Sequence, residues 1–419
     1  MPALKSSARR RGRRWPPRAG AALLALAVLA IVVGPSFMGP GPRVPVVGSP
    51  ADVGLRYESV SFHPPDRPIT LRAWWMPAEA PKAALVLVHG GGDDNRAQAH
   101  ADGLGLARDL VAQRYAVLAL DLRNYGESDG TPEGVTFGEA ESNDVIGAMD
   151  FLAARHPGLR FGALGMSMGG GTILYAAARD ARLEALVTDG TFAEARSIAA
   201  NFVSAATGLP RAVLGPFLWS AERLHGVPLG RGRAIDVAGR IAPRAVLLIH
   251  NEGDPIVPSE HCRRLAAAIP GAQVWITPAP PPAHPLWASQ GRWGMHTQCY
   301  RLQPAEYVKR VTRFFDEVFV GGPPLRKAPP KAIAPTPQKR SGVDRARARS
   351  LYATVRPRAD HWGTRRCRLI DAPRRPRPHF SHSSLPRRWW PPVPRAAPCP
   401  AETVRSTTAT PSSRRPRSV

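Results

Sequence analysis

Ser167 has neighbours that would suit it to nucleophilic chemistry. It lies in LGMSMGGG (residues 164–171), which fits the pattern Gly-x-Ser-x-Gly. The pattern alone is weak evidence, because a chain of this length matches it by chance roughly one time in eight. The apolar run Phe161–Leu164 predicts a strand ending at Gly165, and a helical pattern begins at Met168. A serine at such a corner projects its hydroxyl above a sheet, so we expect Ser167 to attack an acyl carbonyl rather than to sit in a loose glycine-rich turn.

A second glycine-rich segment follows an earlier apolar run. Ala84–Val88 (ALVLV) predicts a buried strand, and HGGG follows it at residues 89–92. Backbone amides in such a turn can donate hydrogen bonds to the oxyanion that forms when a serine attacks a carbonyl, together with the amide that follows the nucleophile. We therefore expect an oxyanion hole formed by the Met168 N–H, with Gly91 or Gly92 as the second donor.

A serine hydroxyl needs a histidine base, and the histidine needs a carboxylate that fixes its tautomer. The predicted strand Ala245–Ile249 runs into NEGDPIVP at residues 251–258. Asp254 lies in this loop past a strand end, where sites of parallel sheets gather. Glu252 is a rival in the same loop, and a simple Asx turn before Pro255 is the alternative without a catalytic role.

Two histidines after the last predicted strand, Gln273–Thr277, are candidates for the base. His284 comes soon after the strand in TPAPPPAHPL, whereas His296 lies twelve residues further on, directly ahead of the last helical pattern. His250 is too close to its strand to compete, and His89 belongs to the glycine turn. Spacing alone leaves both His284 and His296 open.

These candidates all border the elements of one predicted α/β domain. Short apolar runs alternate with helical patterns from residue 57 to 319, which favours a mostly parallel sheet flanked by helices. The patterns predict an opening hairpin from Tyr57–Phe62 and Thr70–Trp75, then strands at Ala84–Val88, Ala116–Leu120, Phe161–Leu164, Ala185–Thr188, Ala245–Ile249 and Gln273–Thr277. Helices are predicted at Ala99–Gln113, Phe137–Arg155, Met168–Arg179, Glu260–Ile269 and Pro304–Phe319.

Composition divides the chain around this domain. The interval 192–240 is longer than one crossover needs and holds apolar pieces such as AVLGPFLW, so it predicts a helical cap over the sheet. We expect a basic N-terminus with an apolar segment at 1–38, a Pro/Gly-rich linker at 39–54, the α/β domain at 55–320 with its cap at about 192–240, and a disordered Pro/Arg-rich tail at 321–419. The tail could bind anionic lipid or polymer, or be a solvated extension without function.

The charge of the 419-residue chain is concentrated at its ends. The net charge is +25, but residues 1–18 hold seven Lys and Arg without an acid, and residues 321–419 hold 23 Lys and Arg against four acids. This leaves a net charge of −1 for residues 19–320. A neutral central domain gives no reason to expect a specific nucleic-acid partner.

An apolar segment follows the basic N-terminus. Six arginines at positions 9 to 18 precede 20 uncharged residues at 19–38, which are enough to span a bilayer. The positive-inside rule keeps the arginines cytoplasmic and places the later domain outside. We therefore expect a membrane anchor with an extracytoplasmic domain. A secretory signal that is cleaved is the alternative, although no A-x-A site follows the segment, and a buried core helix is a third reading.

The four cysteines, at 262, 299, 367 and 399, lack the CxxC spacing of metal sites. A Cys262–Cys299 disulfide and two reduced thiols are both compatible with the sequence.

With these residues in place, the chain resembles the α/β-hydrolase superfamily, and most of all its serine-hydrolase branch related to serine aminopeptidases and acyl-thioesterases, which includes many membrane-anchored members. The resemblance covers about residues 57–319 and rests on VLVHGGGDDN, YAVLALDLRNYGESDG, LGMSMGGG, IHNEGDPIVP and the final histidine-to-FFD segment. DLRNYGESDG matches a structural loop of the family through Asp121, Arg123, Gly126, Ser128 and Gly130.

The family pattern also bears on the base. Members often continue from the catalytic histidine to a Tyr, a Pro, a second Tyr and paired Phe residues, which fit His296, Tyr300, Pro304, Tyr307 and Phe314-Phe315. This favours His296 over His284. The stretch PPPAHPLWASQGRWG before it is longer than the pattern leads one to expect, and it would return His284 to candidacy if it displaced the last helix.

The resemblance implies a serine hydrolase that acts on a small-molecule acyl substrate. Ser167 would attack, His296 would move the proton, Asp254 would orient the imidazole, and the Met168 and Gly91 amides would hold the oxyanion. Water would release the acyl group from the enzyme, and no metal or organic cofactor is implied. An esterase or thioesterase is favoured. A peptidase that anchors its substrate on Glu194 or Glu222 of the cap is a second hypothesis, and a non-catalytic binding protein is a third.

Overall fold

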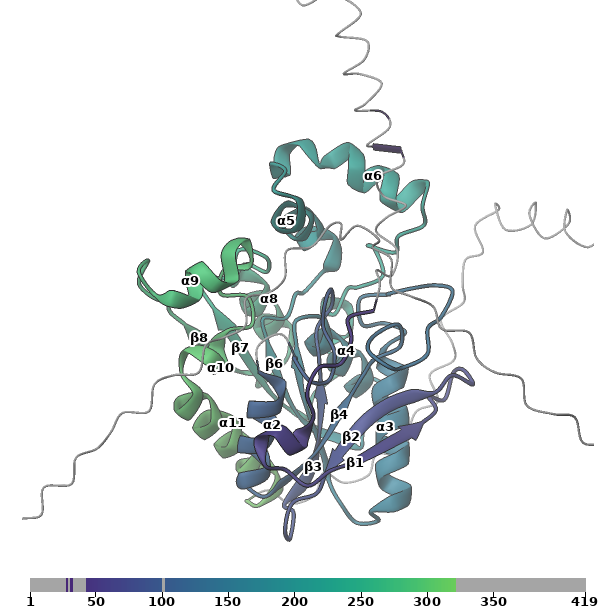
Figure 1. Cartoon of the computed structure of the whole chain (residues 1–419), viewed down its shortest axis with the longest axis vertical. Helices are drawn as coiled ribbons and strands as arrows, with labels where there is room; N and C mark the ends of the chain where they lie inside the picture. Colours follow the sequence, from purple (N-terminus) through teal and green to yellow (C-terminus); the bar gives the residue numbers. More distant parts are fainter. Residues whose placement is uncertain (1–27, 29–30, 33–42, 100–101, 322–419) are drawn as a thin grey trace, which may run out of the picture. The chain divides into compact units, whose positions relative to one another are not determined.

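The structure is a computed structural model and describes residues 28, 31–32, 43–99 and 102–321 (Figure 1). Its centre is an eight-stranded sheet in the order β1-β2-β4-β3-β5-β6-β7-β8. β1 and β2 form an antiparallel hairpin, β2 pairs antiparallel with β4, and all pairs from β4 to β8 are parallel. The strands are β1 Glu58–Phe62, β2 Leu71–Met76, β3 Ala83–Val88, β4 Tyr115–Leu120, β5 Phe161–Met166, β6 Leu183–Asp189, β7 Ala245–Asn251 and β8 Gln273–Thr277.

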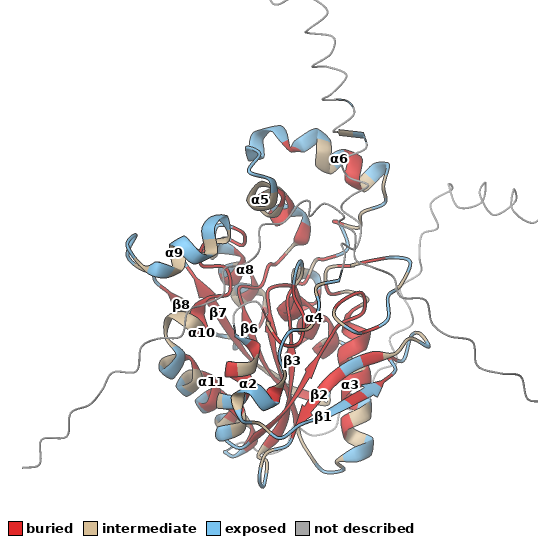
Figure 2. Cartoon of the chain, viewed as in Figure 1, coloured by how far each residue is buried: buried red, intermediate tan, exposed pale blue. Residues whose placement is uncertain are grey.

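Helices cover both faces of the sheet. One core joins the sheet to α3, α4, α7 and α8, and a second core joins its other face to α2, α10 and α11. β3 supplies alternate residues to the two cores, which explains why all of its side chains are buried (Figure 2). The α-helices are α2 Gly103–Ala112, α3 Ser142–Arg155, α4 Met168–Ala177, α5 Ala195–Thr207, α6 Gly215–Arg223, α7 Ile235–Ala238, α8 Glu260–Ala268, α9 Pro285–Gln290, α10 Cys299–Leu302 and α11 Pro304–Phe319, with short 3-10 turns η2 Pro50–Val53, η3 Arg211–Val213 and η4 Gly291–Trp293.

This architecture confirms the predicted mostly parallel α/β fold and its opening hairpin. Two helices begin later than the patterns indicated. The pattern from Phe137 becomes helical only at Ser142, because Phe137 and Gly138 have φ angles of 57° and 102° that a right-handed helix does not accept. The helix predicted from Ala99 begins at Gly103, and Ala99 itself has a φ of 38°.

The predicted cap interval contains α5, η3, α6 and α7, and α5 and α6 lie above the sheet in Figure 1. The side chain of Phe202 in α5 lies over Gly92, where a Cβ would come 3.5 Å from its ring. Asn201 donates a hydrogen bond of 2.9 Å to the Ile256 carbonyl. α5 therefore contacts the loops that follow β3 and β7.

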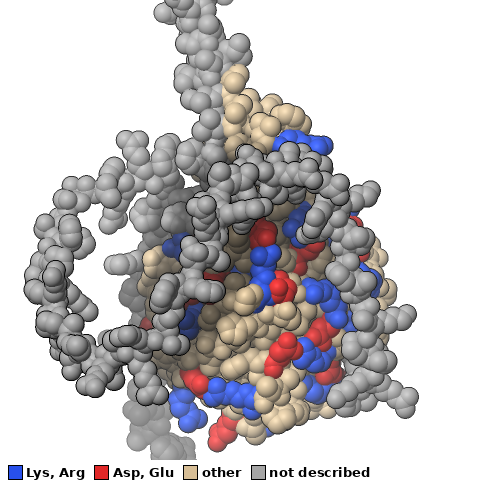
Figure 3. All heavy atoms as spheres, turned by 90° about the vertical axis from the view of Figure 1, so that its right-hand side faces the viewer, with Lys and Arg blue, Asp and Glu red and all other residues tan. Residues whose placement is uncertain are grey.

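Charged side chains of both signs are interleaved on the face drawn in Figure 3. Among the residues that the structure describes, no helix has the length and apolar character needed to cross a bilayer. The predicted anchor at 19–38 lies almost wholly outside those residues, as do the tail beyond Gly321 and Cys367 and Cys399. The anchor, the sidedness of the domain and the disorder of the tail stay predictions of the sequence.

The start of α4 packs directly on the end of β3. A Cβ on Gly169 would fall well inside 3.0 Å of the backbone carbonyl oxygens of Val88 and His89. A Cβ on Gly171, in the same helical turn, would meet nothing nearer than the Phe137 oxygen at 3.8 Å. Of these two positions, Gly169 therefore requires glycine because two backbone segments approach each other there, whereas Gly171 does not.

We expect Gly169→Ala to destabilise the fold by about 3 kcal/mol, because the added methyl group has to push two backbone segments apart. Gly171→Ala is the matched control and should gain about 0.5–1 kcal/mol through helix propensity. Urea unfolding of the two variants measures both effects. Equal stability of the two variants would contradict this account of the packing.

Candidate active site

Ser167 occupies a strained turn between β5 and α4. Its backbone angles are φ 50° and ψ −114°, a conformation that costs a non-glycine residue on the order of 1–3 kcal/mol. The Ser167 N–H donates to the Asp189 carbonyl at 2.8 Å, and the Ser167 carbonyl accepts from the Gly170 N–H and the Thr191 hydroxyl, both at 3.1 Å. These bonds hold the turn in the strand-to-helix corner that the sequence predicts.

His296 lies between Ser167 and Asp254. Its Nε2 is 2.9 Å from the Ser167 Oγ, and its Nδ1 is 2.7 Å from an Asp254 carboxylate oxygen. The Asp254 carboxylate accepts a hydrogen bond from the Nδ1–H, so the lone pair of Nε2 faces the Ser167 hydroxyl. All three residues are at least nine-tenths buried. The structure thus brings together residues from the loops after β5, β7 and β8, in the predicted order Ser, Asp, His.

Two backbone N–H groups fix the orientation of the Asp254 carboxylate. Its Oδ1 accepts the N–H groups of Ile256 and Val257, both at 2.9 Å, which leaves Oδ2 for His296. His250 donates through Nε2 to the Val257 carbonyl at 2.7 Å and lies 3.6 Å from Asp254 Oδ2. Burial lowers the pKa of His250, which favours its neutral form. His250 is too close to its strand to be predicted as the base, and only the fold shows that it lies beside the Asp254 carboxylate.

The rival residues have other contacts. Glu252 is half exposed and forms an ion pair of 3.4 Å with Arg263. His284 accepts the Leu286 N–H through Nδ1 at 3.3 Å and so caps α9. The long stretch at residues 280–294 folds into α9 and η4 and leaves His296 beside Ser167. The structure therefore places neither Glu252 nor His284 in the cluster.

Gly91 lies against Met168, the residue that follows the serine. No hydrogen bond within the described residues engages either N–H, and a Cβ on Gly91 would lie 3.4 Å from the Met168 sulfur, so the two segments are in close contact. The Gly92 amide instead faces the Tyr125 hydroxyl, where it lowers the pKa of a phenol that burial otherwise raises. Of the two second donors that the sequence left open, the geometry favours Gly91.

A buried polar group that the sequence analysis missed lies beside this cluster. Asp189 ends β6, and its carboxyl group is fully buried. Burial raises the pKa of Asp189 to about 7, although the Cys299 thiol, the charge on His296 and the Tyr307 hydroxyl oppose the rise. No local sequence signal marked it, since its contacts come from α10 and α11, more than 100 residues away.

Cys262 and Cys299 are both free and buried, so the disulfide left open by the sequence is not formed. The Cys299 sulfur lies 3.6 Å from the Thr277 hydroxyl oxygen, and burial raises the pKa of both thiols.

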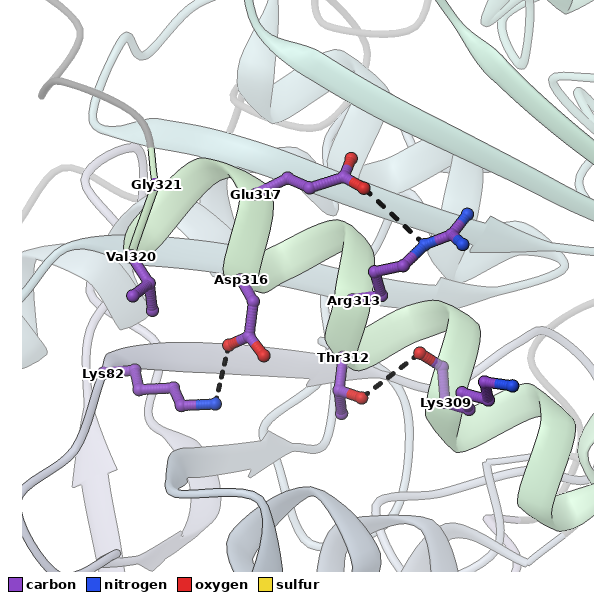
Figure 4. Close-up of a pocket in the computed structure, with 8 residues that line it drawn as sticks. All are labelled: Lys82, Lys309, Thr312, Arg313, Asp316, Glu317, Val320 and Gly321. Carbon is purple, nitrogen blue, oxygen red and sulfur yellow. Dashed lines mark hydrogen bonds and ion pairs between the residues drawn. The ribbon is translucent and has the colours of Figure 1, made fainter.

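A surface hollow beside α11 is separate from this site (Figure 4). Lys82, just before β3, forms an ion pair of 2.6 Å with Asp316 there, and Arg313 lies 3.6 Å from Glu317. Lys82 precedes β3 whereas His89 follows it, so the hollow lies at the opposite end of that strand from the serine. Within the described part of the chain, no three His, Cys, Asp or Glu side chains are arranged to hold a metal ion.

Comparison with known proteins gives matches to hydrolases. The Hydrolase_4 family model, described as serine aminopeptidase, S33, matches residues 79–224. The uncharacterized protein YfhR of Escherichia coli strain K12 is 25% identical over 213 residues, which are 50% of this chain and 66% of YfhR, just under two thirds of that relative.

Solved structures give matches over most of the described domain. The Pyrococcus furiosus esterase Pf2001 is 22% identical, with a TM-score of 0.53 over 66% of this chain and 96% of that one. A second crystal form of the same esterase gives 21% identity and a TM-score of 0.52 over 66% and 98% of the two chains. These likenesses extend to the fold alone. The chain has the α/β-hydrolase fold, and its residues 79–224 match the hydrolase family model described as serine aminopeptidase, S33.

Proposed function

We propose that this protein is a serine hydrolase that cleaves an acyl ester or thioester through an acyl-enzyme. The observation that carries the proposal is the continuous chain of hydrogen bonds from the Asp254 carboxylate through His296 to the Ser167 hydroxyl, at 2.7 and 2.9 Å. Both distances lie within the range that proton transfer requires.

The reaction follows from these positions. Ser167 Oγ attacks the acyl carbonyl as its proton passes to His296 Nε2, and Asp254 stabilises the resulting imidazolium. The Gly91 and Met168 amides donate to the oxyanion. His296 then gives the proton to the leaving alcohol or thiol, which departs and leaves the acyl group on the serine. Water, deprotonated by His296, attacks the acyl-enzyme and restores the serine.

An aromatic pair supports an apolar acyl portion. The rings of Phe202 and Trp293 meet edge to face, with centroids 5.2 Å apart. Phe202 lies over Gly92, and the Trp293 carbonyl accepts the His296 N–H at 3.2 Å. The pair therefore lies between the glycine turn and the loop that precedes His296, and it offers apolar surface next to the proposed reacting atoms.

The two cap carboxylates considered as anchors for a peptide amine already have partners. Glu194 forms ion pairs with Arg264 and, at 3.1 Å, with Arg233, and Glu222 pairs with Arg196 at 3.0 Å. A substrate amine would have to displace an arginine from either carboxylate. This favours the ester over the peptide substrate, but because the matching family model is that of a serine aminopeptidase, the assay should test both bond types.

We expect the full-length chain to react with a fluorophosphonate probe and to hydrolyse p-nitrophenyl esters. Ser167→Ala should abolish labelling, and Ser167→Ala and His296→Ala should each reduce kcat by at least about 10³-fold, because each removes a group that acts in the same step. Labelling is read on a gel and ester turnover by absorbance at several acyl chain lengths, beside an aminoacyl p-nitroanilide.

His284→Ala is the matched control and should keep full activity, because His284 only caps α9. Faster turnover of the anilide than of any ester would favour the peptidase. A folded wild type that neither labels nor hydrolyses any of these substrates would leave the binding-protein hypothesis standing.

The two acids of the β7 loop give a second test. Asp254→Asn should lower kcat by about 10⁴-fold, because an amide in place of the carboxylate no longer holds the proton on Nδ1 of His296. Glu252→Gln, two residues away, should change kcat less than twofold. Steady-state ester hydrolysis measures both variants, and comparable losses in the two would show that Asp254 is not the orienting acid.

A further inference from the structure

The loop DLRNYGESDG, residues 121–130, has no role in the proposed chemistry, yet it brings a tyrosine against the oxyanion amides. We infer that Tyr125 is a positioning residue for the oxyanion hole, in that its hydroxyl group holds the glycine turn and the start of α4 at their working separation. This inference rests on the proposed function, which it extends by one residue.

Tyr125 contacts both segments that carry the expected oxyanion donors. Its hydroxyl group lies 3.9 Å from the Met168 sulfur, and a Cβ on Gly91 would lie 3.6 Å from the same hydroxyl. On the other side, the Gly92 N–H faces the Tyr125 oxygen. The Tyr125 ring meets the His89 ring edge to face, with centroids 4.9 Å apart. One side chain thus spans the gap between the glycine turn and the residue after the nucleophile.

His89 joins the glycine turn to the same loop. The Leu122 N–H donates to His89 Nε2 at 3.1 Å, so the ring proton is on Nδ1, which donates to the Gly90 carbonyl at 2.8 Å. The Gly90 N–H in turn donates to Asp94 at 2.7 Å. The turn is therefore fixed at its first two residues by His89 and Asp94, whereas Gly91 and Gly92 face Tyr125.

The polar residues of the loop hold the turn that carries Tyr125. Asp121 accepts the N–H groups of Arg96 and Glu127, at 2.8 and 2.9 Å, and the Ser128 hydroxyl donates to the Asp121 carbonyl at 2.6 Å. Gly126 has a φ of 47° and lies so close to the Asp121 carboxylate that a Cβ would overlap it. These bonds fix the turn that carries Tyr125, whose ring contacts His89 of the glycine turn.

The position of the hydroxyl has a mechanistic consequence. Donors to an oxyanion act by being held in place before the charge develops, so a change in the separation of two amides weakens them in the transition state more than in substrate binding. Removing the hydroxyl alone should therefore lower kcat and leave KM nearly unchanged. A residue with a merely structural role would instead lower stability without this split.

Tyr125→Phe in the full-length chain is the test, since the ring and its contact with His89 stay. Tyr115→Phe is the matched control. Tyr115 is also buried, and its hydroxyl donates to Asp316 at 2.7 Å at the far end of β4. We expect kcat of Tyr125→Phe for p-nitrophenyl esters to fall about 10- to 100-fold with KM within about threefold, below the loss of a whole donor. Tyr115→Phe should keep kcat.

Hydrogen exchange gives a readout that does not need turnover. Amides in peptides covering residues 88–94 and 166–172 should exchange at least roughly fivefold faster in Tyr125→Phe than in wild type or Tyr115→Phe, because the turn opens more often without the hydroxyl. If the wild type hydrolyses no ester, the proposed function fails, and exchange alone decides whether Tyr125 holds the turn.

Three results would overturn the inference. Unchanged exchange together with unchanged kcat would show that the hydroxyl holds nothing. Faster exchange with full kcat would show that the hydroxyl group holds the turn but that this does not affect stabilisation of the oxyanion. A loss of kcat with unchanged exchange would assign the hydroxyl to direct contact with substrate instead of to positioning.

Discussion

The site depends on one close contact between backbones, that of α4 on the end of β3. Because Gly169 has no side chain, the first turn of α4 reaches the carbonyl oxygens of Val88 and His89. This contact brings the amide of Met168 next to the glycine turn, and it forces Ser167 into a conformation that residues other than glycine rarely adopt. The bond from the Ser167 N–H to the Asp189 carbonyl ties the same corner to β6, so the corner contacts three adjacent strands.

Burial strengthens the hydrogen bonds that join Asp254, His296 and Ser167, and it also imposes a desolvation cost on the carboxylate. A carboxylate removed from water has to be compensated by donors, and Asp254 has two backbone N–H groups and the imidazole of His296. Asp189, close by, lacks such a set of donors, and burial raises its pKa to about 7. The two carboxyl groups near His296 therefore differ in the hydrogen-bond donors that compensate their burial.

The loops over the sheet are linked to one another as well as to the strands. Phe202 on α5 contacts the glycine turn and Trp293. Its neighbour Asn201 donates a hydrogen bond to the Ile256 carbonyl in the loop that follows β7. Tyr125 contacts the glycine turn from the other side. The hydrogen-bonded cluster of Ser167, His296 and Asp254 therefore lies among segments that are far apart in the sequence and that contact each other at the ends of the parallel strands.

The sequence by itself determined the strands and the mostly parallel type of the sheet, because each buried strand is a local run of apolar residues. It also determined the position of Ser167, because a serine flanked by glycines is typical of a sharp strand-to-helix corner. It also predicted Asp254 and, with help from the family pattern, His296 as partners of Ser167, and the structure places the three side chains within hydrogen-bond distance. It missed the late starts of α2 and α3, since left-handed residues such as Phe137 carry no local mark. Only the tertiary structure places His296, and not His284, beside Ser167, and shows that the Gly92 amide faces Tyr125. It also revealed His250, Asp189 and Tyr125, because each of these choices depends on contacts between residues remote in sequence, and the packing of the sheet alone brings them together.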